Sequence, residues 1–349
     1  MTEDAPGTAV MIPDIPTAGG MHCETTALGA LLAHAGTPLS EPMLFGLGSG
    51  LSFVYWDSKR QDAPFLGGRV KPFALTRNLA ARLRLELREQ ETSSPRKAWE
   101  QVRAAIDAGI PVGLQLDSYD LEYFTSKVHF AGHMVAMRGY DDERAHLIDT
   151  AQQGGAVSTS LASLAAARAA KGPMSARNRS FVLAVPDPDA VAPDRLVPAA
   201  FGAIAACAEE FLAPPIANLG VRGIRTAAGR IPAWLGRVSD PGRDLALIAT
   251  LMERGGTGGA LFRNLYRDFL GECLERVDGG AGSGPLAQGH ALFAESAALW
   301  TEAAGLIGAA AGGDPAPLGA AAARLRSIAD IEGAAMTALL PLAALADVG

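Results

Sequence analysis

The spacing of hydrophobic and polar positions divides the chain into a first half with strand-like alternation and a helical second half. Residues 82–88 alternate between charged residues and leucine, which predicts a half-buried strand. Short apolar runs predict further strands at 111–116, 133–140, 145–149 and 180–185. The polar segment 140–143 joins two of these runs so closely that they should pair as antiparallel neighbours.

Two helices are expected among these strands. Apolar residues recur at helical spacing from Cys23 to Ala35, and Gly36 would end that helix. Ser94 followed by Pro95 is a helix-start signal, because the Ser side chain can cap the first turn and Pro is tolerated there. This second helix should end near Gly109. The first half is therefore predicted to mix helices and strands.

Near residue 186 the pattern changes to Ala- and Leu-rich helical stripes. Three prolines punctuate a linker at this point, so we expect domains at 1–189 and 190–349. Helices are predicted at about 198–212, 216–235, 243–254, 259–277, 287–311 and 315–346, the last with a break at Pro341. The sequence thus predicts an α+β protein whose C-terminal domain is all-α.

Composition fits a folded protein and argues against several functional classes. Of 349 residues, 49% are hydrophobic and 19% charged, so a packed core is expected. The net charge is −7 and the basic residues are dispersed, which argues against nucleic acid as a partner. Three cysteines without a His/Cys cluster indicate neither a disulfide framework nor a metal site. The glycine-rich segment 46–50 matches no nucleotide-binding fingerprint, so no cofactor is expected.

Targeting signals are not evident in the sequence. Met1–Gly7 is acidic and lacks the apolar stretch of a signal peptide. The Ala-rich stretches near the C-terminus are interrupted by Asp, Arg and Pro, so no membrane span is expected. We therefore predict a soluble cytoplasmic protein. The Ala-rich helices could also pack against a second copy of the chain, which leaves a homo-oligomer open.

Cys23 is the residue with the clearest chemical potential. It stands where a glycine-rich turn gives way to the first predicted helix. A helix N-terminus supplies partial positive charge and a neighbouring imidazolium a full one, and both favour the reactive thiolate. A buried, unreactive cysteine is the alternative that Cys23 alone leaves open.

His133 and Asp149 are the candidate partners of Cys23. His133 opens one predicted strand and Asp149 closes the next, sixteen positions later. Because antiparallel neighbours bring such ends together, Asp149 could hold one ring nitrogen while the other faces Cys23, the layout of a papain-like thiol catalyst. Alternatively, His133 is a core histidine and Asp149 caps the following turn. His129 competes with His133 as the base, or lines the substrate cleft.

Other polar residues could contact a substrate. His22 flanks the nucleophile and could bind an oxyanion or substrate, although a surface histidine is the plainer interpretation. Asp117 and Tyr123 lie between a predicted strand and His129, where a solvated loop is the alternative. The backbone N–H of Cys23 is the natural oxyanion donor. The preceding segment contains no Gln, so a second donor is unassigned.

Several segments together resemble the butirosin biosynthesis protein H family. In the first half the similarity covers most of residues 20–185 and rests on His22–Leu28, on Ser40-Glu41 leading to Phe45–Gly50, and on His129–His133 before Gly139-Tyr140-Asp141. The second half is similar to the helical domain that commonly follows, through Gly255–Gly259, Phe262-Arg263 and Tyr266–Leu270.

The resemblance implies a papain-like cysteine peptidase fold for the N-terminal domain. It also implies Cys23 as nucleophile, His133 as base and Asp149 as the residue that orients the base. The family takes its name from an acyltransferase that moves an aminoacyl group from an acyl carrier protein to an aminoglycoside amine. The expected function is therefore amide-forming acyl transfer in specialised metabolism, from a carrier or other thioester donor to a small-molecule amine.

Two alternatives to acyl transfer stay open. A cysteine peptidase or amidase would differ only in letting water resolve the acyl-enzyme, and a catalytically silent binding module would use none of this chemistry. In the helical domain, Arg263 could bind a carboxylate or phosphate of a carrier arm. It could equally pair with Asp268 or Glu272 on the helix surface.

Overall fold

The structure, a computed structural model, describes residues 9–59, 61–172 and 174–346, so Met1–Gly7 lies outside the described residues. The chain forms two compact units, Met1–Leu44 with Leu83–Ala190 and Phe45–Arg82 with Val191–Gly349. The change of unit at residue 190 lies next to the sequence boundary between 1–189 and 190–349. The grouping differs from that division in one segment, because 45–82 clusters with the C-terminal helices.

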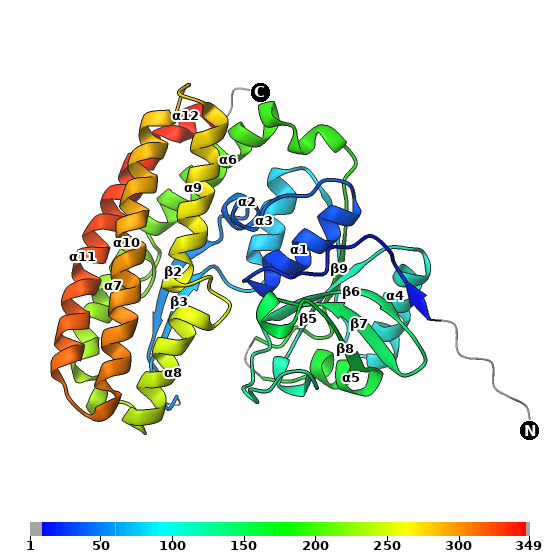
Figure 1. The fold of residues 1–349 in the computed structure, drawn as a ribbon, viewed down its shortest axis with the longest axis horizontal. Helices are drawn as coiled ribbons and strands as arrows, with labels where there is room; N and C mark the ends of the chain where they lie inside the picture. The colour runs from blue at the N-terminus through cyan, green and yellow to red at the C-terminus, as the bar shows by residue number, and fades with distance from the viewer. Residues whose placement is uncertain (1–8, 60, 173, 347–349) are drawn as a thin grey trace, which may run out of the picture. The chain divides into compact units, whose positions relative to one another are not determined.

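An antiparallel sheet forms the centre of the first unit (Figure 1). Its strand order is β4-β9-β5-β6-β7-β8, and β1 pairs with β6. The strands are β1 (Val10–Met11), β4 (Glu86–Gln90), β5 (Val112–Leu116), β6 (His133–Tyr140), β7 (Arg144–Ile148), β8 (Ala156–Ser160) and β9 (Ser180–Ala184). The four strands predicted from residue 111 onward are confirmed to within one residue at each end. All of β5 is buried, as expected for a strand covered on both faces.

Helices pack against this sheet. α1 (Cys23–His34) contacts β6 and β5, while α4 (Pro95–Asp107) and α5 (Leu161–Ala169) also contact β5. Figure 1 shows α1 and α5 on opposite sides of the sheet. The Ser94 side chain accepts the Lys97 backbone N–H at 3.3 Å, which confirms the predicted cap of α4. The first unit is thus the predicted mixture of α and β.

The strand predicted at 82–88 is displaced along the chain. Arg82 ends α3 (Ala74–Arg82), and β4 begins only at Glu86. Between them, Arg84 adopts a left-handed conformation with φ 52°, which an extended strand does not contain. Leu83 and Leu85 are nevertheless buried. The alternating pattern therefore reflects two buried leucines that lie in a turn, not the buried face of a strand.

The second unit combines helices with a β-hairpin. The helices are α6 (Pro193–Leu212), α7 (Gly220–Arg230), α8 (Pro241–Arg254), α9 (Arg263–Val277), α10 (Ser283–Ala309), α11 (Ala316–Leu339) and α12 (Ala343–Ala346). After α2 (Glu41–Leu47), β2 (Leu51–Trp56) pairs with β3 (Phe65–Arg69). Phe53 of β2 packs on Trp300 of α10 with ring centroids 5.6 Å apart. The helices after residue 190 are present as predicted for the second domain, and the compact unit that contains them also includes this hairpin.

One helical stretch, Ala316–Ala346, is long and apolar enough to cross a membrane by length and composition alone. A 3₁₀ turn at Leu340–Leu342 interrupts it, which confirms the break predicted at Pro341. In the structure α11 packs along α10 and α7 within the second unit. Core helices of folded proteins pass the same test, so the stretch is weak evidence for a membrane span.

Candidate active site

Cys23 is the first residue of α1. The preceding His22 is extended, with φ −103° and ψ 131°, and forms the N-cap. The Cys23 backbone N–H therefore lies in the first helical turn, where the helix itself offers no acceptor. Cys23 is only 7% exposed. A thiol in this position lies at the positive end of the helix dipole, and only a small part of the residue is accessible to solvent.

The hairpin formed by β6 and β7 brings His133 and Asp149 together. His133 opens β6, and Asp149 directly follows β7, whose last residue Ile148 pairs with Ala136. The distance between His133 Nε2 and Asp149 Oδ2 is 2.8 Å, and both side chains are almost completely buried. The contact predicted from the hairpin is therefore present. Because Asp149 is bonded to Nε2, the other ring nitrogen of His133, Nδ1, is the one that can face Cys23.

The surroundings of His133 favour its protonated form. Burial alone would lower its pKa, but the Asp149 carboxylate and then the nearby Cys23 outweigh burial and raise the pKa from 6.5 to about 10. The ring of Phe124 packs edge-on against His133 at 5.1 Å between centroids. The site thus stabilises an imidazolium between two partners that carry or can acquire negative charge.

We expect this raised pKa to be measurable by NMR titration of the His133 ring. The His133 resonance should titrate near pH 10 instead of near 6.5. Asp149→Asn should lower the His133 pKa more than Cys23→Ala does, because Asp149 is the stronger of the two raising partners. A wild-type value near 6.5, or an unchanged value in Asp149→Asn, would contradict this description of the site.

Asp149 is held by three donors. Its Oδ2 accepts the Tyr123 hydroxyl at 2.7 Å as well as the His133 ring, and its Oδ1 accepts the Thr150 backbone N–H at 2.6 Å. Burial, followed by the proximity of the Asp149 carboxylate, raises the Tyr123 pKa far above 10, so the phenol remains a donor. Tyr123, predicted as a substrate contact, is bonded to the Asp149 carboxylate.

Removing the Tyr123 hydroxyl should weaken the site without dismantling it. Hydrogen bonds to charged groups contribute about 1.5–3 kcal/mol, so Tyr123→Phe should slow acylation of Cys23 by roughly tenfold. With one donor fewer on Asp149, the His133 pKa should rise further. The measurement is the acylation rate as a function of pH, with Tyr119→Phe in the same loop as the control. Equal rates in both variants would remove Tyr123 from the site.

The turn before Cys23 is anchored by Glu41. The Glu41 carboxylate accepts the backbone N–H groups of Met21 and His22, at 2.8 and 2.7 Å for the shortest contacts, and the Thr25 hydroxyl at 2.8 Å. On its other side, a Cβ on Gly19 would lie 2.3 Å from the Asp149 backbone oxygen. The same turn therefore contacts both Cys23 and Asp149. Sequence reasoning missed this role of Glu41, since eighteen positions separate it from Cys23 and no local pattern connects them.

Three further residues that the sequence suggested as substrate contacts are His22, His129 and Asp117. His22 is 2% exposed, so the interpretation as a surface histidine is wrong, and its Nδ1 lies 3.3 Å from the Thr25 hydroxyl. His129 is bonded through Nδ1 to Asp117 at 3.0 Å and stacks on Tyr119. Asp117 also accepts backbone N–H groups of its own loop. It therefore orders that loop, and His133 rather than His129 is paired with Asp149.

Arg263 lies in the interior of the second unit. Its guanidinium is fully buried and forms two hydrogen bonds with the Glu332 carboxylate, at 2.8 and 2.9 Å. The surface pairing predicted with Asp268 or Glu272 is thus wrong, and a carrier arm in solution has no exposed Arg263 to contact. The helical pattern could not reveal Glu332, which lies on another helix 69 positions away.

The described part of the chain contains no group of three or more His, Cys, Asp or Glu residues that could hold a metal ion. The three cysteines, Cys23, Cys207 and Cys273, are free and buried. Burial raises the pKa of both Cys207 and Cys273 to about 12, which keeps these two thiols protonated and unreactive. Cys23 is the cysteine that has a histidine partner at a helix start.

The geometry describes a thiol, an imidazole and a carboxylate in sequence, and comparison with known families agrees with the similarity seen in the sequence. Residues 22–150 match the family model described as butirosin biosynthesis protein H, N-terminal. Residues 162–339 match a domain of unknown function, DUF4872. The chain therefore belongs to the butirosin biosynthesis protein H family. No curated protein matches the sequence.

Proposed function

We propose that this protein is a cysteine-dependent acyltransferase of natural product biosynthesis, with a papain-like first domain. The family name points to a biosynthetic pathway for a natural product. The observation that carries the chemistry is the buried His133–Asp149 hydrogen bond, together with a Cys23 thiol at the start of α1 that helps to raise the pKa of the same ring. This array argues against a silent binding module.

The proposed reaction has two steps. The Cys23 thiolate attacks the carbonyl carbon of a carrier thioester, and the backbone N–H of Cys23 stabilises the oxyanion that forms. The carbon–sulfur bond to the carrier breaks, and His133 gives its proton to the departing thiolate. An acyl group now occupies Cys23 as a thioester.

An amine then resolves the acyl-enzyme. Its nitrogen attacks the same carbonyl carbon while His133 takes up an amine proton. The bond to the Cys23 sulfur breaks, and the thiolate returns beside the imidazolium. Asp149 keeps the ring oriented throughout, because its carboxylate is itself fixed by Tyr123 and Thr150.

A turnover assay separates transfer from hydrolysis. The protein is mixed with an aminoacyl-pantetheine thioester, with and without a panel of small-molecule amines, while released thiol and products are followed. Transfer predicts amide products and a faster thiol release when the acceptor amine is present. Release that is independent of every amine, with free acid as the product, would favour an amidase or peptidase instead.

A further inference from the structure

Arg168 near the end of α5 is a buried cation whose described contacts are all uncharged. It is 3% exposed, and its terminal nitrogens donate to the backbone carbonyls of Ala98 at 3.2 Å and Asn178 at 3.1 Å. Its Nε has no hydrogen-bond partner among the described residues. A buried charge without a counter-ion is costly, and burial lowers the pKa of Arg168 to about 10.

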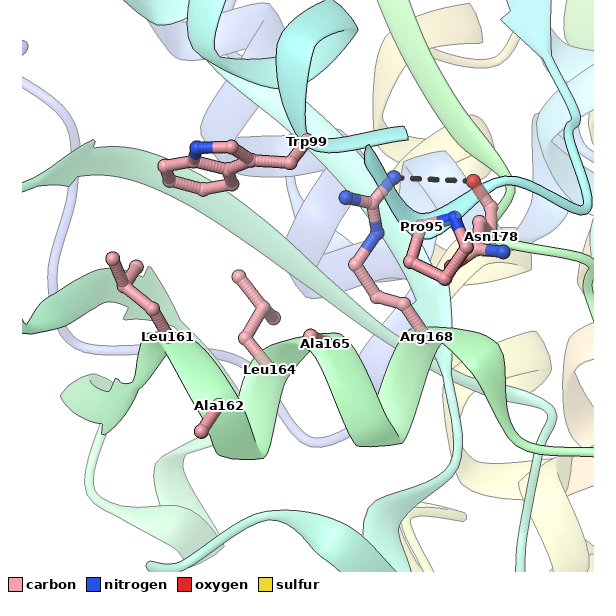
Figure 2. Close-up of a pocket in the computed structure, with 8 residues that line it drawn as sticks. All are labelled: Pro95, Trp99, Leu161, Ala162, Leu164, Ala165, Arg168 and Asn178. Atoms are coloured by element: carbon pink, nitrogen blue, oxygen red, sulfur yellow. Dashed lines mark hydrogen bonds between the residues drawn. The ribbon is translucent and has the colours of Figure 1, made fainter. Parts of the chain in front are cut away.

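The guanidinium borders a cavity of about 330 Å³ in the first unit. The cavity is lined by Pro95, Trp99, Leu161, Ala162, Leu164, Ala165, Arg168 and Asn178. Figure 2 shows the Arg168 guanidinium at one end, with Trp99 beside it and facing Leu161 and Leu164 of α5. The volume suits a small ligand, and the walls are largely apolar.

We propose that this cavity binds a small apolar monocarboxylate, whose carboxylate accepts hydrogen bonds from Arg168. A guanidinium has five N–H donors, and the two carbonyls use two of them, so the guanidinium keeps unused donors for a carboxylate. Among the lining residues Arg168 is the one charged group. A single positive charge matches a monoanion better than a dianionic phosphate, and Trp99 offers a flat apolar surface to the rest of the ligand.

The site is separate from the proposed catalytic array, because none of Cys23, His133 and Asp149 lines it. Ligand binding here should therefore survive Cys23→Ala unchanged. Ligand binding at this site and acylation of Cys23 can therefore be tested separately, so failure of one does not imply failure of the other.

The test is a titration with phenylacetate, followed through the methyl NMR signals of Leu161 and Leu164. Phenylacetate should shift these signals saturably, and the neutral isostere phenylacetamide should bind at least tenfold more weakly. Arg168→Met should remove the preference for the anion. Ala165→Phe, which fills the cavity and leaves Arg168 intact, should abolish binding, whereas Ala166→Phe on the same helix but outside the lining should not.

Three outcomes would overturn the proposal. Shifts that are equal for phenylacetate and phenylacetamide would identify an apolar cavity without anion recognition. Tighter binding of phenyl phosphate than of phenylacetate would exclude a monocarboxylate site. The absence of any saturable shift in the folded wild-type protein would exclude the site altogether.

Discussion

Replacing His133 by Gln is expected to slow acylation of Cys23 by about 10³-fold, because a positioned acid–base group typically contributes 10²–10⁴-fold. Gln cannot carry the proton that the departing thiol receives, and it cannot stabilise a thiolate as an imidazolium does. The measurement is the single-turnover rate of acylation from a thioester at pH 7, compared with the wild-type rate.

His129→Gln is the matched control for this prediction. His129 lies four positions earlier and has an exposed side chain bonded to Asp117, so the substitution should change the acylation rate by less than about threefold. If instead His129→Gln removed activity and His133→Gln retained it, the competing assignment of the base would be correct. Circular dichroism and the unfolding midpoint should show that both variants are folded.

Breaking the buried ion pair of the second unit should have the largest effect on stability. Arg263 and Glu332 are both 0% exposed, and the carboxylate also accepts bonds from Ser296 at 2.6 Å and Trp300 at 2.8 Å. Arg263→Met would leave Glu332 as a buried, uncompensated charge. We expect a loss of about 3–5 kcal/mol in the free energy of unfolding, measured by urea denaturation.

Neutralising the remaining charge should recover part of this loss. In Arg263→Met/Glu332→Gln the amide oxygen can still accept from Ser296 and Trp300, so the cost should fall to about 1–2 kcal/mol. Arg324→Met breaks the exposed pair with Glu302, whose side chains are 47% and 52% exposed, and should cost at most about 1 kcal/mol. A double variant as unstable as the single one would contradict the charge-burial explanation.

The parts of the fold that local pattern governs could be predicted from the sequence. The apolar run of β6, the polar turn after it and the run of β7 required an antiparallel hairpin, and a hairpin brings His133 to Asp149. The helical stripes after residue 190 likewise predicted helices, since each covers one apolar face. The strand predicted at 82–88 was misplaced because alternation shows which residues are buried, but it does not show whether the backbone between them is extended.

Contacts between distant segments could not be predicted in this way. The turn before Cys23 is fixed by Glu41 on another helix, and Arg263 finds Glu332 across the helical unit. Packing also decides the grouping of 45–82: Gly46 has no side chain because a Cβ there would meet the Phe269 ring at 2.1 Å. Hydrophobic periodicity identifies which faces are buried, but it does not identify the partner that each face meets.

The central claim is that Cys23 carries the acyl group, and intact-protein mass spectrometry tests it directly. After mixing with an aminoacyl-pantetheine thioester, the wild-type protein should gain the mass of one acyl group, mapped by proteolysis to the peptide that contains Cys23. Cys207→Ala should gain the same mass, and Cys23→Ala should gain none. A wild-type protein that stays unmodified, or an adduct that persists in Cys23→Ala, would contradict the account.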